Sequence, residues 1–238
     1  MNRLMAVVIG LTATANAAQA IEVTGGMIDL SYSAFIDETE LSKSTLTGSI
    51  ELAFNQIASA QLDIGRDSFG FSDLANLSLG VHGIYHMNSN TSLGAFYTHD
   101  KAEVGGLSDT TNLYGIEAGH DTGLVDIEGY LGRGKSSEVD GTLVGISGRY
   151  GMPNRIGLTG SIDYLDIEGV EVSKIALKLD GDLSENLNLY VEVGQAKVSA
   201  FGSSESEPFM GIGGRITFGA DRGTTFERRS LGDLLPGL

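Results

Sequence analysis

The sequence lacks several features that define common protein classes. It has no cysteine, no tryptophan and only three prolines in 238 residues. The absence of cysteine excludes a disulfide scaffold and a cysteine-based zinc site. After residue 20 no stretch of about 18 apolar residues occurs, the length that a transmembrane helix needs. Basic residues are also scarce, at 15 Lys and Arg against 31 Asp and Glu, and the net charge of −16 argues against a nucleic-acid partner.

The first twenty residues have the features of an export signal. Residues 1–3 give a short, positively charged start, and residues 4–12 are apolar. Ala18-Gln19-Ala20 is a typical small-x-small cleavage site. We therefore expect residues 1–20 to be removed, so that the mature chain begins at Ile21 outside the inner membrane.

The rest of the chain alternates apolar and polar residues with a period of two. Residues 45–54 are one example, with Leu46, Ile50 and Phe54 on one face and Thr45 and Glu51 on the other. Side chains of a strand point alternately to its two faces, so this pattern predicts a strand with one apolar face. Twelve such segments are predicted, near residues 23–35, 45–54, 57–66, 75–87, 91–99, 111–121, 124–133, 142–151, 156–165, 171–180, 186–198 and 208–218.

The connections between these segments alternate between short and long. The short ones include residues 55–56 and 122–123, and the longer ones include residues 36–44, 100–110 and 199–207. This alternation is typical of an all-β, transmembrane, up-and-down antiparallel β-barrel with tight periplasmic turns and larger outer loops. An even number of about twelve strands places both termini of the barrel on the periplasmic side.

The aromatic residues distinguish a membrane barrel from a soluble sandwich, which also alternates. On the apolar face, Tyr and Phe lie near the segment ends and small or aliphatic residues fill the middle, as two aromatic belts at lipid–water boundaries require. We predict that the belts consist of Tyr32, Tyr97, Tyr114 and Tyr164 at the long-loop end, and of Phe54, Tyr85, Tyr150 and Phe218 at the short-turn end.

The arrangement over residues 21–218 resembles bacterial outer-membrane β-barrel proteins of the porin type. Residues 210–218 alternate up to Phe218 and are similar to the closing-strand signal that the barrel assembly machinery reads. The resemblance implies a location in the outer membrane of a Gram-negative cell, contact with outer-membrane lipid and lipopolysaccharide, and passage of small hydrophilic solutes. Residues 219–238 continue past this signal, and we expect them to form a C-terminal periplasmic tail or a tail that lies in the lumen.

The opposite face of the strands is expected to line a lumen. Its net acidic character predicts a diffusion channel with a mild preference for cations. Inward glycines such as Gly94, Gly194 and Gly213 favour an open path, whereas mutual pairing of the charges would block the lumen and favour a structural or surface-interaction barrel. The predicted pore-lining residues are Glu51, Asp63, Glu117, Asp126, Glu128, Asp163, Glu192, Arg149, Lys174, Lys178 and Arg215.

Enzymatic residues are not apparent in the sequence. His82 and His86 share the inward face, but their spacing in a strand separates them by about 13 Å, too far for joint metal ligation. No G-x-S-x-G motif occurs, and no calcium-loop motif is present among the acidic residues. We therefore expect no enzymatic activity, cofactor or metal site, although a barrel hydrolase stays open because the strand register that could bring a histidine to a serine is unknown.

Overall fold

The structure is a computed structural model. It describes residues 21–70, 72–136, 140–167, 169–200, 202–220 and 223–235. The expected export signal, residues 1–20, lies outside the described residues. Within those ranges no helix is long and apolar enough to cross a membrane.

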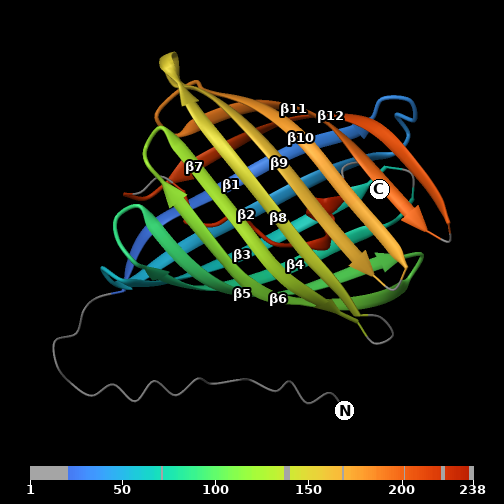
Figure 1. Ribbon diagram of the computed structural model, residues 1–238, viewed down its shortest axis with the longest axis horizontal. Helices are drawn as coiled ribbons and strands as arrows, with labels where there is room; N and C mark the ends of the chain where they lie inside the picture. Colours follow the sequence, from blue (N-terminus) through green and yellow to red (C-terminus); the bar gives the residue numbers. More distant parts are fainter. Residues whose placement is uncertain are drawn as a thin grey trace, which may run out of the picture.

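In the described part of the chain, twelve antiparallel strands pair in a closed ring. Figure 1 shows the resulting barrel. Each strand pairs with its neighbours in sequence, and β1 pairs with β12 to close the ring, from Gly26 opposite Phe218 to Phe35 opposite Phe209. The prediction of an all-β up-and-down barrel of about twelve strands is confirmed. The strands are β1 (Glu22–Phe35), β2 (Ser42–Asn55), β3 (Ala58–Phe69), β4 (Ala75–His86), β5 (Thr91–Val104), β6 (Leu107–Asp121), β7 (Val125–Lys135), β8 (Asp140–Met152), β9 (Ile156–Ile167), β10 (Val170–Asp182), β11 (Leu187–Ala200) and β12 (Ser203–Phe218).

The two ends of the barrel are named here by their connections. The turn end carries the start of β1, the end of β12 and the five short connections, among them the 3-10 helix η1 (Pro153–Arg155). The loop end carries the other connections, beginning with residues 36–41 between β1 and β2. The predicted short turns all fall at the turn end.

The loop end departs from the prediction, because several expected loops are largely strand. The expected loop over residues 100–110 is one case, since β5 and β6 extend until only Gly105 and Gly106 separate them. Both glycines have positive φ angles, 56° and 85°, which a tight hairpin turn requires. The extensions were missed because they carry polar residues on both faces, so the period-two signal ends before the strand does.

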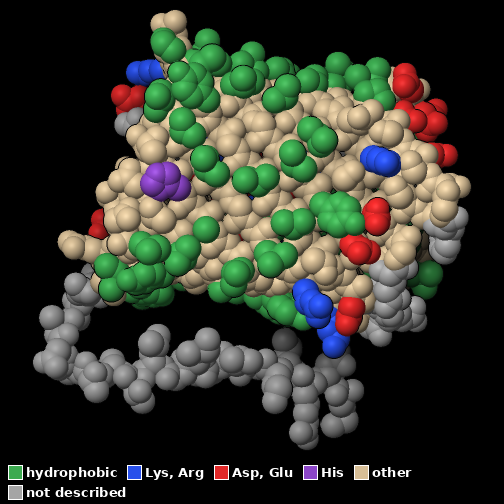
Figure 2. All heavy atoms as spheres, viewed as in Figure 1, with side chains coloured by type: hydrophobic (Ala, Val, Ile, Leu, Met, Phe, Trp, Pro, Cys, Tyr) green, Lys and Arg blue, Asp and Glu red, His purple; other side chains and the backbone are tan. Residues whose placement is uncertain are grey.

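The outer surface of the barrel is apolar between its ends. Figure 2 shows charged side chains gathered near the two ends, with aliphatic and uncharged groups over most of the flank between them. Outward residues such as Leu30 and Ile116 are more than half exposed, as lipid-facing side chains would be. Among the predicted belt residues, Tyr164 is half-buried, and the exposed ones are Tyr32, Tyr97, Tyr114, Phe54, Tyr85, Tyr150 and Phe218.

The chain after β12 turns back into the barrel. Gly219 has a φ of 88°, and Gly223 then passes so close to β1 that a Cβ on Gly25 would lie 1.6 Å from the Gly223 carbonyl oxygen. Residues 223–235, called the C-terminal segment below, run through the lumen to the short 3-10 helix η2 (Leu231–Leu234) near the loop end (Figure 1). Of the two locations expected for the tail, the periplasm and the lumen, the described part lies in the lumen.

Candidate functional site

A charged cavity of about 640 Å³ lies between the C-terminal segment and the wall formed mainly by β7–β12. It extends from Asn188 near the turn end to Leu143 and Phe209 near the loop end. Most of the predicted pore-lining residues border it, namely Asp126, Glu128, Asp163, Glu192, Arg149, Lys174, Lys178 and Arg215. The other three, Glu51, Asp63 and Glu117, are buried beside the C-terminal segment on the opposite wall.

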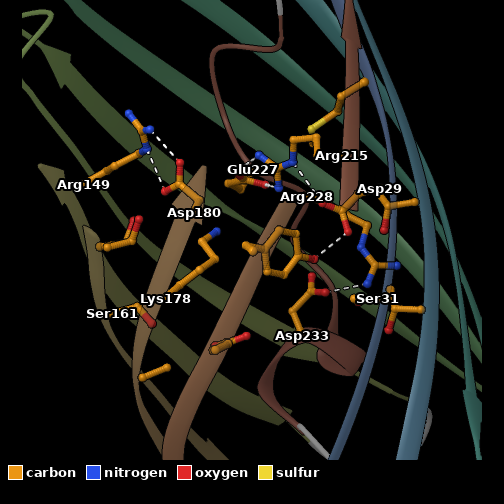
Figure 3. Close-up of a pocket in the computed structure, with 18 of the residues that line it drawn as sticks. Asp29, Ser31, Arg149, Ser161, Lys178, Asp180, Arg215, Glu227, Arg228 and Asp233 are labelled. Atoms are coloured by element: carbon orange, nitrogen blue, oxygen red, sulfur yellow. Dashed lines mark hydrogen bonds and ion pairs between the residues drawn. The ribbon is translucent and has the colours of Figure 1, made fainter. Parts of the chain in front are cut away.

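The cations of this cavity are paired locally and do not form a row facing the acids across open water. Arg149 binds Asp180 through two hydrogen bonds of 2.7 and 3.1 Å (Figure 3). Lys178 lies over the ring of Tyr190, 5.2 Å from its centroid. Lys174 donates a 2.7 Å hydrogen bond to the Asp233 carbonyl oxygen of the C-terminal segment. The wall and the segment are thus electrostatically coupled.

The space that inward glycines were expected to leave open is largely occupied by aromatic rings. A Cβ on Gly194 would lie 2.6 Å from the ring of Phe209, and one on Gly213 would lie 2.3 Å from the ring of Tyr190. Gly94 is covered by Phe226 of the C-terminal segment. The glycines therefore accommodate neighbouring side chains, and the lumen is narrower than the glycine count suggested.

The C-terminal segment is anchored to the wall of β2 and β3 through its backbone. Gln61 is fully buried, donates a 2.8 Å hydrogen bond to the Phe226 carbonyl and accepts one of 3.2 Å from the Phe226 N–H. The Thr225 N–H donates a 2.7 Å hydrogen bond to the carboxylate of Glu51. These side chains pair backbone groups of the segment that would otherwise be buried without partners.

Farther along, two consecutive arginines of the segment meet acidic groups of the wall. Arg228 donates to Ser78 at 2.8 Å and to the Asp67 carboxylate at 3.3 Å, and its side chain is only 4% exposed. Arg229 donates to Glu117 at 3.2 Å and also pairs with Glu128. Carboxylates of the barrel therefore contact both guanidinium groups, and Arg228 also pairs with Asp233 of the segment itself (Figure 3).

Glu227 of the segment faces the opposite wall. Its carboxylate accepts two hydrogen bonds from Arg215, at 2.6 and 3.0 Å. Burial acts to raise the pKa of Glu227, but the positive charges of Arg215 and Lys178 outweigh it and lower the pKa from 4.5 to about 2. The ion pair that ties the segment to β12 therefore persists well into the acidic range.

A buried apolar cluster, called the loop-end seal below, lies in the lumen near the loop end. Inward side chains of β5, β6, β8, β9 and β10 pack against Leu234 of the C-terminal segment, which is 2% exposed. Leu231 and Leu235 lie at the edge of this cluster. The wall residues of the seal are Phe96, Leu113, Leu143, Leu165 and Val172. A second buried cluster beside the cavity consists of Phe35, Ala176, Ala196 and Phe209.

The strand register does bring a histidine to serines, but without the geometry of a nucleophilic triad. The hydroxyl of Ser59 lies 2.9 Å from Nε2 of His86, while Nδ1 of that ring contacts the hydroxyl of Ser92 and no carboxylate. Glu51 instead accepts a 2.6 Å hydrogen bond from Ser59 itself. The orienting acid that a serine nucleophile needs behind its base is therefore not in place among these residues.

Several lumen residues were missed by the sequence reasoning. Asp67 and Asp100 were not predicted as lining residues, although both are almost fully buried and contact the C-terminal segment. The inward position of His82 was predicted but its contacts were not: it is 0% exposed and lies between the carboxylates of Asp63, at 2.7 Å, and Glu117. The signal for Asp67 and Asp100 was that every second residue of a strand faces the lumen. The predicted strands ended before these two positions, so the pattern was not extended to them.

No protein-family model matches the sequence, and no curated protein matches it significantly. The fold is nevertheless similar to solved outer-membrane channels. A KdgM porin matches with a TM-score of 0.61 at 13% identity, covering 81% of this chain and 99% of that chain. An outer membrane channel from Pseudomonas putida F1 matches with a TM-score of 0.56 at 14% identity, covering 84% and 97%. A NanC porin matches with a TM-score of 0.56 at 7% identity, covering 79% and 98%. The chain therefore has the fold of porin-type barrels.

Proposed function

We propose that this protein is an outer-membrane channel for the passive diffusion of small hydrophilic solutes or ions. The apolar outer surface, the closed barrel and the porin-type fold support this proposal. The observation that carries it is the charged cavity of about 640 Å³, because a purely structural barrel of this size has no need of polar space inside.

The charges of the cavity support a mild preference for cations. Among the residues that line it, ten are Asp or Glu and seven are Lys or Arg. A lumen with net negative charge attracts cations and raises their local concentration. One solved structure is a KdgM porin in complex with disordered oligogalacturonate. The net negative charge of the present cavity instead favours positively charged solutes.

In the state described, the C-terminal segment and the loop-end seal narrow the path. A hydrophobic constriction can stop conduction by excluding water. Opening therefore requires the C-terminal segment to withdraw toward the turn end, which would remove Leu234 from the seal. The specific alternative is a structural or surface-interaction barrel with a permanently blocked lumen, and the same seal is the observation that favours it.

Single-channel recording in planar bilayers tests the proposal. We expect the full chain to give small, interrupted current steps. A chain ending at Phe218 is expected to give larger, steady steps with a reversal potential shifted toward cation selectivity. Folding of both proteins is verified by the change in electrophoretic mobility on heating. The absence of current from both folded proteins would refute the channel and support the structural barrel.

A further inference from the structure

We propose that the lumen wall of β3–β7 is a binding site for guanidinium groups, which Arg228 and Arg229 occupy as a built-in ligand. When the C-terminal segment withdraws, the site takes a small solute with two cationic groups, as an arginine-containing dipeptide has. This inference rests on the proposed channel function and names the class of solute that the channel selects.

The first half of the site surrounds Arg229. Two carboxylates, Glu117 and Glu128, accept hydrogen bonds from its guanidinium group. The ring of Tyr130 lies next to the same group, with a distance of 4.3 Å from the ring centroid to the guanidinium carbon. A guanidinium group suits all three contacts, since its several N–H donors reach both carboxylates while its delocalised charge contacts the ring. An ammonium group is a compact, strongly hydrated charge and suits them less well.

The second half of the site surrounds Arg228. On the wall its guanidinium group contacts Asp67 at 3.3 and 3.5 Å and the Ser78 hydroxyl at 2.8 Å, and it also pairs with Asp233 of the segment itself, at 2.5 Å. Asp67 is itself held by a 2.8 Å hydrogen bond from Thr45 and one of 3.3 Å from Asn76. The carboxylate is therefore fixed in position by the wall, independently of the arginine.

The acids on this wall exceed what anchoring of the segment requires. Buried ion pairs contribute little net stability, because desolvation of the charges offsets their attraction, whereas packing of Leu234 anchors the segment without that penalty. An empty wall would present Asp67, Glu117 and Glu128 to the lumen with fixed geometry. Such a surface favours a solute that brings the same cations.

Chemical rescue of R229A in the full chain tests the site without measuring current. The substitution removes the guanidinium group and leaves Glu117, Glu128 and Tyr130 in place. We expect R229A to lower the temperature at which the barrel loses its folded electrophoretic mobility. Ethylguanidinium is expected to restore at least half of this loss, ethylammonium to restore less, and neutral ethylurea to restore none. R133A, which removes an exposed outward arginine of β7, is the matched control and is expected to show no rescue.

Two further outcomes decide the inference. If R229A does not fold, ethylguanidinium present during refolding in detergent is expected to increase the folded fraction. Equal effects of ethylurea and ethylguanidinium, or no effect of either, would overturn the guanidinium site. In R228A/R229A, N-acetyl-arginyl-arginine amide is expected to act at a concentration about tenfold lower than N-acetyl-arginine amide, which has one cationic group, because one molecule of the former fills both halves. Equal potency would overturn the two-cation solute. A barrel that conducts nothing but shows rescue would refute only the channel.

Discussion

A reversible disulfide between the C-terminal segment and the barrel should control whether the proposed channel conducts. The chain has no cysteine, so the variant D67C/G232C carries a single thiol pair. A Cβ on Gly232 would lie 2.7 Å from Cγ of Asp67. That distance places the two Cβ atoms no more than about 4.2 Å apart, within the range of natural disulfides. The bond should therefore form without moving the segment.

The magnitude follows from the contacts that D67C removes. Asp67 is fully buried and pairs with Arg228, which keeps its second partner Asp233 in the variant, so D67C removes one charge-assisted contact, at a cost of about 1.5–3 kcal/mol. With the disulfide reduced, this loss weakens docking of the segment, and about 2 kcal/mol raises the withdrawn population on the order of thirtyfold. With the disulfide formed, the segment cannot withdraw.

The assay is planar-bilayer recording of the same protein before and after addition of a reductant, with disulfide formation verified by mass spectrometry. We expect the oxidised protein to stay closed and the reduced protein to open. The single variants D67C and G232C, treated in the same way, control for direct effects of the reductant. Equal open probability in the oxidised and reduced protein would refute the reasoning that withdrawal of the segment opens the channel.

Three further predictions concern docking of the C-terminal segment. The pKa of Glu227 is lowered from 4.5 to about 2, so its ion pair with Arg215 contributes fully to docking of the segment above pH 4.5 and is lost as the pH falls through about 2. Conductance should therefore be the same at pH 7 and pH 5 and should rise below pH 3. E227Q should abolish this rise. L234A removes packing from the loop-end seal and should destabilise the docked segment by about 2–5 kcal/mol, so the open probability should exceed that of the wild type at least tenfold. Leu183 at the turn end is exposed, and L183A should match the wild type in the same recordings. G219A should lower the thermal midpoint more than G123A, because both positions have positive φ but only a Cβ on Gly219 meets backbone atoms, and equal shifts would contradict that account.

The strands and their outward faces could be predicted because lipid imposes a simple rule on them. Every second residue must be apolar over the thickness of the membrane, and positions such as Ile28, Leu30 and Tyr32 follow that rule. The rule ends where the strand leaves the lipid. The hairpin at Gly105 and Gly106 lies beyond that point, so the sequence showed a polar stretch without showing that it continued as strand.

The interior could not be predicted in the same way, because its packing depends on contacts between residues far apart in the chain. The sequence shows that Gly194 has no side chain to fill the space beside it. That the ring of Phe209 fills this space depends on the register of β11 against β12. The contact of Gln61 with Phe226 joins positions 165 residues apart. The tail itself has balanced charges and a few leucines, which fit a solvated periplasmic segment equally well.

The two kinds of contact made by the C-terminal segment have different consequences for a channel. When the segment withdraws, water hydrates the charges that Arg228 and Arg229 and their acidic partners had buried, so these ion pairs add little to the net free energy of docking. The same acidic groups determine which solute can replace the segment. The burial of Leu234 has no such replacement in water, so it supplies the net stabilisation of the closed state. Selectivity should therefore follow the acidic wall and open probability the loop-end seal. Substitutions at Glu117 should shift the reversal potential, whereas substitutions in the seal should change mainly how often the channel opens.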